Sequence, residues 1–419
     1  MTPQTPEPAA SGRPPLPARE AAARIASRLV ASGCTAYFAG GCVRDRLLGL
    51  EPSDYDVATD ATPARIAQIF PGARGVGESF GVMLVRSGGR TVEVATFRSD
   101  GRYLDGRRPE SVDFGTAEQD ARRRDFTING LFEDPESGRI VDFVGGVEDL
   151  QKRLLRAIGS PDQRFQEDRL RVLRAVRFAA RFDLTWDPAT QAAVRRHAGD
   201  LMGVSRERVG QEVRRMLSHP SRGRSVAEVE SMGLAAAVLM EPEGTLEGRR
   251  VASLPPAVPL AAALAAWQLD RALPAREPEG VRCERWTRAL VLSNAESRLL
   301  LETLEIHAAL EDRWDAWDLA ARKRSAAREG FPAALLLRRA EAPEAAEVVA
   351  TAFERFRQEG LAPPPLVTGD HLIALGMRPG PAFRGILDAL YDRQLRGELT
   401  NPGDALQAAR ELVERGAAR

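Results

Sequence analysis

The sequence predicts an α+β fold in which a small mixed sheet near the N-terminus is followed by an all-helical remainder. Short apolar runs bounded by glycine, proline and acidic residues occupy the chain up to about residue 146, as expected for strands joined by tight turns. From Val147 onward strand signals largely stop, and the C-terminal half is Ala-, Leu-, Glu- and Arg-rich with helical periodicity. We therefore expect a domain change near residue 147.

The composition is typical of a globular protein and gives no indication of a polyanionic partner. Lys+Arg and Asp+Glu both number 59 among 419 residues, so the formal charges balance. The three cysteines, Cys34, Cys42 and Cys283, have no pairing pattern, which indicates a reducing compartment and the cytoplasm as the expected location. No apolar run reaches the ~18–20 residues of a membrane span. The Pro- and Ala-rich start predicts a disordered leader over residues 1–20.

A glycine pair between a predicted strand and a predicted helix is typical of a phosphate-binding turn. Ala36-Tyr37-Phe38 is short and apolar, Gly40 and Gly41 follow, and Val43–Leu50 has helical character. Glycines allow a sharp turn that brings backbone N–H groups up to a phosphate. The N-terminus of the following helix favours negative charge at the same point.

Three carboxylates are predicted near this turn. Asp54 and Asp56 lie in a predicted strand over residues 54–58, where a period of two places them on one face, about 6–7 Å apart. Two such carboxylates repel unless a cation lies between them, and Mg²⁺ is held by one or two carboxylates together with substrate phosphates. Glu93, on another predicted strand, is a candidate third ligand. The alternative for Asp54 and Asp56 is that they are surface acids that cap a loop. The alternative for Glu93 is that it is an exposed strand glutamate.

The remaining elements of the N-terminal part follow from turn and cap signals. Thr62-Pro63 is a good start signal for a helix ending near Phe70, because proline suits the first helical position. Gly88-Gly89 separates two apolar runs that we expect to form a hairpin. The other predicted ranges are a helix at 21–32, the hairpin strands at 80–85 and 91–97, and a strand at 141–143.

Two polar segments between these elements are candidate ligand contacts. Asp100–Pro109 has two glycines, several charges and no periodicity, which predicts a mobile loop of the kind that closes on a substrate. The run Arg122-Arg123-Arg124 lies within residues 120–131, and adjacent arginines repel unless an anion is near. Guanidinium groups suit the oxygens of a triphosphate, a ribose or a nucleic-acid backbone. A solvated basic turn is the plain alternative.

A charged helix predicted over residues 163–182 carries a candidate base-reading pair. Glu167, Asp168 and Arg171 are spaced so that one continuous helix would place all three on one face. An Asp acceptor beside an Arg donor can meet the Watson–Crick edge of a base. An intrahelical salt bridge worth ~0.2–0.5 kcal/mol explains the spacing equally well.

Six motifs in order resemble those of the class II tRNA nucleotidyltransferases, the CCA-adding enzymes whose relatives include bacterial poly(A) polymerases. The resemblance covers about residues 37–217 and is faint beyond residue 221. The motifs are GG-x-VRD at 40–45, D-x-D at 54–56, EV-x-TFR at 93–98, RRDFT-x-N at 123–129, GG-x-EDL-x-x-R-x-LR at 145–156 and ED-x-x-R at 167–171. In one departure, Asn129-Gly130 stands where the family usually has Asn-Ala, and we expect this glycine to loosen a following helix.

The resemblance implies template-independent addition of CMP, CMP and AMP, taken from CTP and ATP, to the 3′ end of tRNA. It implies that Asp54 and Asp56 bind catalytic Mg²⁺, that Glu93 completes the catalytic ligands, and that Asp168 and Arg171 read the nucleotide base. The full set of residues that it implies in nucleotide binding is Gly40, Gly41, Arg44, Arg123, Arg124, Asp125, Asn129, Glu167, Asp168, Arg171, Arg174 and Arg177.

The resemblance also implies an order of domains after the leader. Within the helical neck, a basic helix is predicted over residues 205–217, where Arg208 is a candidate contact to RNA or a solvated residue. Pro255–Pro259 and Pro363–Pro365 predict linkers between helical groups. The expected domains are a nucleotidyltransferase head at 21–146, a neck with the nucleotide-selecting helix at 147–220, a helical body at 221–330 and a tRNA-binding tail at 331–419.

Two other functions fit parts of this pattern. A poly(A) polymerase, or a partial enzyme that adds only CC or only A, would share the motifs. The loop at 100–109 argues against CC-only addition, and the lack of a basic terminal extension argues against poly(A) polymerase. An RNA-binding protein on an inactive scaffold would have no need of Asp54 and Asp56.

Overall fold

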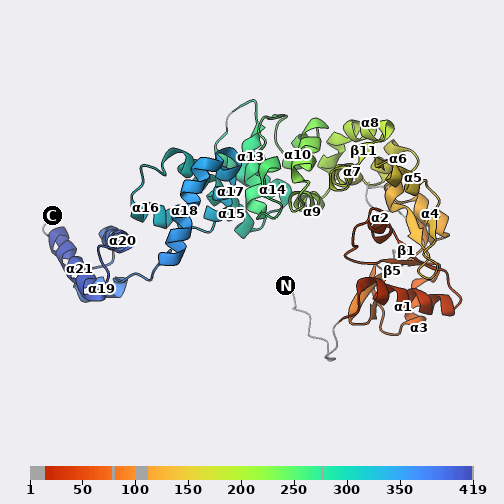
Figure 1. The fold of residues 1–419 in the computed structure, drawn as a ribbon, viewed down its shortest axis with the longest axis horizontal. Coiled ribbons are helices and arrows are strands. Elements are labelled where there is room, and N and C mark those ends of the chain that lie inside the picture. Colours follow the sequence, from red (N-terminus) through yellow and green to blue (C-terminus); the bar gives the residue numbers. More distant parts are fainter. Residues whose placement is uncertain (1–14, 78–80, 101–111, 276, 418–419) are drawn as a thin grey trace. The chain divides into compact units, whose positions relative to one another are not determined.

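The structure is a computed structural model that describes residues 15–77, 81–100, 112–275 and 277–417. The predicted loop Asp100–Pro109 therefore lies outside the described residues except at its first position. Contacts divide the chain into two compact units, which are described separately (Figure 1). They are Met1–Glu212 with Glu228–Val238, and Val213–Ala227 with Leu239–Arg419.

A seven-stranded mixed sheet forms the first half of the first unit, as predicted. Its spatial order is β3-β4-β5-β2-β1-β8-β9, and of these neighbouring pairs only β2–β5 is parallel. A separate antiparallel pair, β6 Arg98–Asp100 and β7 Val112–Phe114, flanks residues 101–111. The strands of the main sheet are β1 Ala36–Ala39, β2 Val57–Thr59, β3 Arg74–Gly77, β4 Val82–Ser87, β5 Arg90–Thr96, β8 Leu131–Glu133 and β9 Ile140–Asp142.

Helices cover both faces of this sheet. α1 Ala18–Ala31 packs on β1, β2, β4 and β5, and it contacts α3 Pro63–Ile69. On the opposite face, Ala58 of β2 and Phe132 of β8 form a core with Ala121 of α4 Ala117–Arg122. α2 Gly41–Leu47 follows β1 directly and also contacts β8.

The strand predicted at 36–38 and the predicted hairpin are confirmed. Both hairpin-turn glycines have positive φ, 55° at Gly88 and 79° at Gly89, which suits a two-residue turn. β2 begins at Val57, so the prediction that Asp54 and Asp56 lie inside this strand is wrong, and both acids precede it. β3 and β8 have no counterpart in the predictions, because runs of three or four residues carry too little periodicity.

The glycine that departs from the family pattern has a local packing role. Gly130 precedes β8 rather than a helix, so the expectation that it loosens a following helix is wrong. A Cβ at Gly130 would lie 2.7 Å from Val144 Cγ2, which is closer than real Cβ contacts come. The glycine therefore makes room for Val144.

The first helices begin close to where the sequence predicts them. α1 begins at Ala18, so the last three residues of the predicted leader are helical. α2 begins at Gly41 and ends at Leu47, earlier at both ends than predicted. α3 is confirmed, and the Thr62 side chain accepts a hydrogen bond from the Arg65 backbone N–H at 3.3 Å.

The rest of the first unit is mostly helical, which confirms the predicted fold class. One short parallel strand pair interrupts the helices, β10 Leu154–Leu155 with β11 Thr185–Trp186. The elements are α5 Gly146–Gln151, α6 Pro161–Glu167, α7 Arg171–Arg181, α8 Pro188–Arg196, the 3₁₀ segments η2 Thr127–Asn129 and η3 Ala198–Gly203, and the first part of α9 Arg206–Leu217.

The prediction of one helix over residues 163–182 is wrong, because the chain breaks between α6 and α7. Asp168 has an extended backbone, with φ −141° and ψ 102°. Its side chain accepts a hydrogen bond from the Leu170 backbone N–H at 3.1 Å, and such local bonds compete with helix formation. Asp168 therefore does not share a helical face with Arg171.

The second unit consists of helices and one antiparallel pair of two-residue strands, β12 Thr245–Leu246 and β13 Arg271–Ala272. Its helices, some of which begin in or extend into the first unit, are α10 Arg222–Ser231, α11 Ala235–Leu239, α12 Arg250–Ser253, α13 Leu260–Asp270, α14 Glu279–Leu290, α15 Asn294–Asp312, α16 Leu319–Ala326, α17 Phe331–Glu341, α18 Pro343–Glu359, α19 Gly369–Ala374, α20 Pro381–Leu395 and α21 Pro402–Ala417.

Two hydrophobic clusters stabilise the C-terminal helices. One includes Trp314, Phe331 and Phe356 and joins α15 to α18, so a domain boundary at residue 330 would divide it. The other includes Leu372 and Leu390 and joins α19 to α21. The predicted linkers at 255–259 and 363–365 lie outside helices. No helix in the described part of the chain is long and apolar enough to cross a membrane.

Candidate active site

The turn between β1 and α2 requires glycine at its first position. Gly40 has φ 70° and ψ −114°, and its backbone N–H donates to the Leu131 carbonyl at 2.9 Å. A Cβ on Gly40 would lie 2.6 Å from Nη1 of Arg124. Glycine thus permits both the positive φ and the close approach of an arginine. Gly41 is the first residue of α2.

The three predicted carboxylates lie around one cavity of about 340 Å³, whose lining includes Asp54, Asp56 and Glu93. Asp54 and Asp56 are exposed while Tyr55 between them is buried, so the two acids point to the same side even though they precede the strand. Asp56 and Glu93 directly precede the paired residues Val57 and Val94, and the charge of Glu93 acts on Asp56. The three side chains therefore line one cavity, and their shared role as metal ligands stays a prediction.

The grouping of the three carboxylates changes the pKa of Asp56. Desolvation, together with the charges of Glu93 and Asp54, raises the pKa of Asp56 to about 6, and Arg124 partly opposes the shift. No described side chain forms a hydrogen bond or ion pair with these three carboxylates. A divalent cation would relieve the repulsion between them.

The oxygen donors fit Mg²⁺, but a complete set of protein ligands is not preformed. Among residues 15–77, 81–100, 112–275 and 277–417, no group of three His, Cys, Asp or Glu side chains is arranged to hold a metal ion. Glu93 lines the cavity without forming a ready third ligand. Two carboxylates with substrate phosphates remain sufficient for Mg²⁺, which usually retains several waters.

The arginine triplet divides between two partners. Arg122 pairs with Glu118 at 2.8 Å and is exposed. Arg123 and Arg124 both pair with the buried Asp120, at 2.6 and 2.9 Å. For Arg123 and Arg124, an anion of the chain itself, Asp120, relieves the repulsion. No motif identified Asp120, although its spacing of three and four residues from these arginines could have done so.

A buried polar network connects α2 to α7 through η2. Arg44 donates to Asp45 at 2.6 Å and to the side-chain oxygen of Asn129. Asn129 Nδ2 donates to Asp125 at 2.9 Å, and Asp125 pairs with Arg174 at 2.8 Å. The predicted site residues Arg44, Asn129, Asp125 and Arg174 are thus brought together, but largely by bonds to one another.

The charges in this network are strongly coupled. Burial raises the pKa of Asp125, but the Arg174 charge and the hydrogen bond from Asn129 outweigh it and hold that pKa far below the usual range. Burial lowers the pKa of Arg44, whose guanidinium lies 4.2 Å from the ring centroid of Phe182. Asp125 is therefore charged at neutral pH.

Arg177 has a partner that the motif analysis did not identify. It pairs at 2.5 Å with Glu212, which is buried on α9. Arg177 is itself buried and lies 4.2 Å from the ring centroid of Phe178. These contacts tie α7 to α9.

The candidate base-reading residues have different partners from those predicted. Arg171 donates to Glu167 at 2.8 Å, which confirms that contact. Asp168 instead pairs with Arg208 at 2.7 Å, so the alternative of an intrahelical Asp168–Arg171 salt bridge is wrong, while base reading by the two residues stays a prediction. Arg208 is not simply solvated, because its guanidinium is held by a residue 40 positions away.

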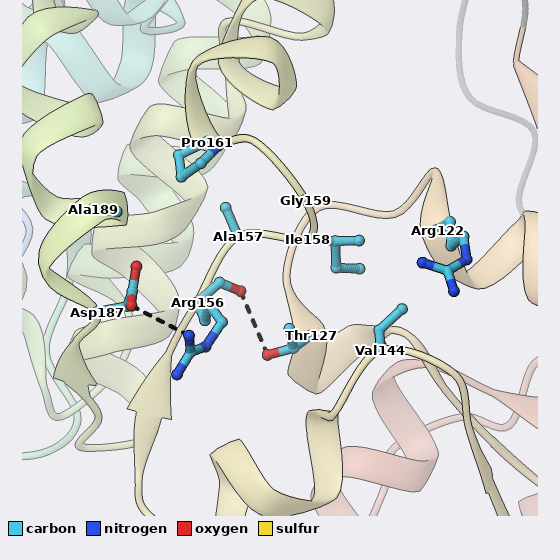
Figure 2. A pocket seen from close by; sticks show the side chains of 10 residues that line it. All are labelled: Arg122, Thr127, Val144, Arg156, Ala157, Ile158, Gly159, Pro161, Asp187 and Ala189. Atoms are coloured by element: carbon cyan, nitrogen blue, oxygen red, sulfur yellow. Dashed lines mark hydrogen bonds and ion pairs between the residues drawn. The ribbon is translucent and has the colours of Figure 1, made fainter.

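A second cavity of about 260 Å³ lies between η2 and the segment that leads into α6, and Figure 2 shows its lining. Arg156 pairs there with Asp187 at 3.5 Å and with Asp149 at 3.2 Å. Thr127 Oγ1 donates to the Arg156 carbonyl at 3.4 Å. Arg122 lines this cavity, whereas Arg123 and Arg124 do not.

Comparisons with known proteins agree with this geometry. Two family descriptions match the chain, "Poly A polymerase head domain" over residues 36–156 and "Probable RNA and SrmB- binding site of polymerase A" over residues 183–245. The chain is 35% identical to a CCA-adding enzyme of Lacticaseibacillus paracasei over 91% of this chain and 93% of that protein. It is 34% identical to one from Limosilactobacillus fermentum over 95% and 98% of the two chains.

A solved structure supports the same assignment. The fold is similar to that in "Crystal structure of Bacillus stearothermophilus CCA-adding enzyme in complex with CTP", with a TM-score of 0.80 and 28% identity. The match covers 96% of this chain and 99% of that one. With relatives above 30% identity matched over nearly their whole length, the chain belongs to the family of CCA-adding enzymes, the tRNA nucleotidyltransferases.

Proposed function

We propose that this protein adds CMP, CMP and AMP, taken from CTP and ATP, to the 3′ end of tRNA. The observation that carries the proposal is the cavity lined by Asp54, Asp56 and Glu93. The Gly40 turn and Arg124, whose charge acts on Asp56, belong to the same region. Nucleotidyl transfer requires carboxylates that can hold a metal ion beside a turn that can bind phosphate.

In this proposal Asp54 and Asp56 hold Mg²⁺, and Glu93 assists them. Mg²⁺ in such a site activates an attacking hydroxyl and neutralises the charge of the leaving pyrophosphate. Arg123 and Arg124 bind phosphate and sugar oxygens of the incoming nucleotide, because each is only partly buried while its anionic partner is buried. The protein then contributes mainly positioning and charge stabilisation.

Base selection is assigned to the break between α6 and α7. Asp168 offers a carboxylate held by Arg208, and Arg171 is held by Glu167. The buried network supports this region, and its predicted site residues are Arg44, Asp125, Asn129, Arg174 and Arg177.

We assign the second unit to tRNA binding. The free cysteines Cys34, Cys42 and Cys283 favour the reducing cytoplasm as the place where the protein acts.

The test is an incorporation assay with Asp54→Asn and Asp56→Asn on tRNA transcripts ending before C, after C and after CC. Both variants should lose about 10²- to 10³-fold in rate, as expected when a charge-stabilising group is removed, while tRNA binding stays within a few fold. Glu51→Gln, a nearby exposed acid, is the control and should keep wild-type turnover. Full activity in either aspartate variant at saturating Mg²⁺ would contradict the assignment.

The same transcripts test the reaction itself. Wild-type protein should add C to the first two substrates and A to the third, and it should then stop. Addition of A alone would indicate a partial enzyme, and long A tails would indicate a poly(A) polymerase. No incorporation of any nucleotide would overturn the proposed function.

A further inference from the structure

Asp120 occupies an unusual position between two arginines of the nucleotide site. It lies on α4, and only 2% of its surface is exposed. Oδ1 accepts from Nε and Nη2 of Arg123 at 2.9 and 2.6 Å, and Oδ2 accepts from Nε and Nη2 of Arg124 at 3.1 and 2.9 Å. Each carboxylate oxygen therefore receives two hydrogen bonds from one guanidinium, which fixes the plane of that guanidinium.

The charge state of Asp120 suits this role. Burial raises the pKa of Asp120, but the charges of Arg124 and Arg123 and their hydrogen bonds lower it by more, so the net shift is downward. The carboxylate is therefore ionised at neutral pH. The side chains of Arg123 and Arg124 are 21% and 19% exposed, so each has one side toward Asp120 and another toward solvent.

Arg124 is fixed from three further sides. Its Nη1 donates to the Asn129 carbonyl at 3.0 Å, and its guanidinium lies 5.0 Å from the ring centroid of Phe132. The same Nη1 lies where only a glycine fits, against Gly40 in the turn that precedes α2. The guanidinium thus sits over the predicted phosphate-binding turn rather than in open solvent.

The contacts of neighbouring acids set Asp120 apart. Glu118, two residues earlier on the same helix, pairs with Arg122, and both of these side chains are at least half exposed. Such an exposed i,i+4 pair contributes little and holds nothing in place. Asp120 alone on α4 joins two arginines of the nucleotide site.

We propose that Asp120 is a positioning residue for nucleotidyl transfer, which holds Arg123 and Arg124 in the orientation that meets the phosphate and sugar oxygens of the incoming nucleotide. The inference rests on the proposed function, because it assumes that these arginines bind the nucleotide. A free arginine side chain samples many rotamers. Fixing both arginine side chains in advance removes the entropic cost of ordering them from the binding and reaction steps. Asp120 itself does not touch the nucleotide.

The expected signature of Asp120→Asn is a loss of about 10- to 100-fold in kcat/KM, the range that follows from misplacing a positioned group by about 1 Å. The loss should be equal for CTP and ATP, because phosphates and ribose are common to both. Equilibrium binding of CTP without tRNA should weaken as well, which provides a measurement independent of turnover. Glu118→Gln is the matched control and should change neither quantity more than twofold.

A mutant cycle against the pair of substitutions Arg123→Lys and Arg124→Lys separates positioning from general damage. If Asp120 acts through these two arginines, then Asp120→Asn should cost at most about twofold in the background that carries both lysines. A folding defect would instead reduce the active fraction by the same factor in both backgrounds, and multiplicative losses would overturn the inference. An unequal loss for CTP and ATP would also overturn it.

The controls distinguish this inference from the proposed function. If wild-type protein adds nucleotides to tRNA and the cycle shows no coupling, only the positioning role of Asp120 is wrong. If wild-type protein adds none, the proposed function fails before the cycle is measured. Thermal melting of each variant shows whether the substitution leaves the fold intact.

Discussion

Arg171 donates to three acceptors of its own chain before any ligand is present. Nη1 donates to Glu167 at 2.8 Å and to the Arg164 carbonyl at 3.1 Å, and Nη2 donates to the Arg123 carbonyl at 3.1 Å. Arg171 is also buried. Its guanidinium is therefore rigid, as a residue that reads a base should be, but it also contributes to stability.

We expect Arg171→Ala to reduce both stability and nucleotide choice. Loss of charge-assisted hydrogen bonds should lower the free energy of unfolding by roughly 1.5–3 kcal/mol. If Arg171 reads the base, discrimination against UTP and GTP should fall by about 5- to 150-fold, as expected for the loss of a bidentate contact worth ~1–3 kcal/mol. Single-turnover incorporation of all four nucleotides on tRNA ending in CC measures the second effect.

Arg164→Ala is the matched control for this experiment. Arg164 pairs with the other oxygen of Glu167 at 2.7 Å, so its removal weakens the same cluster. We expect lower stability in this variant and unchanged nucleotide ratios. Unchanged ratios in Arg171→Ala as well would leave Arg171 with a structural role alone.

At the scale of the element, the β1–α2 turn combines a strained backbone with a close contact. Gly40 has positive φ, and the space where its Cβ would be is taken by the Arg124 guanidinium. Gly49, just beyond α2, also has positive φ (73°), but no atom lies within 4 Å of the point that a Cβ would occupy there. A comparison of substitutions at the two glycines therefore distinguishes the effect of a positive φ from the effect of the close contact with Arg124.

Gly40→Ala should impair nucleotide binding beyond the effect of strain. Gly49→Ala should cost about 1–2 kcal/mol of stability, because an L-residue is forced to a positive φ. Gly40→Ala should cost at least as much, because it adds a contact with Arg124 to the positive φ. Only Gly40→Ala should also displace Arg124 and raise the Kd for CTP by tenfold or more. Calorimetric titration with CTP measures the difference, and equal Kd values for the two variants would show that the close approach has no functional role.

At the scale of the whole molecule, the two units have separate stabilising centres. In the second unit Glu341 of α17 accepts hydrogen bonds from His307 of α15 at 2.8 Å and from Arg250 of α12. Arg250 also pairs with Asp270 of α13 at 3.1 Å. Burial raises the pKa of Glu341, but the bonds from His307 and Arg250 outweigh it and lower that pKa to about 2.

This shift predicts acid sensitivity of the second unit. A folded-state pKa below the ordinary value of about 4.5 means stability that is present above pH 4.5 and lost as the pH falls toward 2. Glu341→Gln should therefore lower the free energy of unfolding by roughly 2–3 kcal/mol at pH 7. The difference from wild type should shrink progressively below pH 4.5.

Tryptophan fluorescence can follow this unit during urea unfolding. Trp267, Trp286, Trp314 and Trp317 lie in the second unit, and only Trp186 lies in the first. Glu354→Gln, which breaks an exposed pair with Arg357, should change stability by less than about 0.5 kcal/mol at any pH. An equal loss for Glu341→Gln at pH 7 and pH 3 would refute the role of its ionised form.

The sequence by itself determined the features that depend on neighbouring residues. The strand at 36–38, the Gly88-Gly89 hairpin and the Thr62 cap follow from local periodicity, backbone freedom and capping, so they could be predicted. The family motifs identified the pair Asp54 and Asp56 and the arginine triplet for a similar reason, because the spacing within each is short. The predicted alternation of exposed and buried side chains over residues 54–56 is present, although β2 begins only at Val57.

Only the tertiary structure decided which partner a charged side chain takes when the two lie far apart in the sequence. Asp168 pairs with Arg208 across 40 residues, and Asp125 pairs with Arg174 across 49, so no local spacing reveals either pair. The helix break at Asp168 was missed because a side-chain bond to its own backbone competes with a helical pattern that otherwise continues. Long charged side chains have many local partners of similar energy, and burial in the folded chain selects among them.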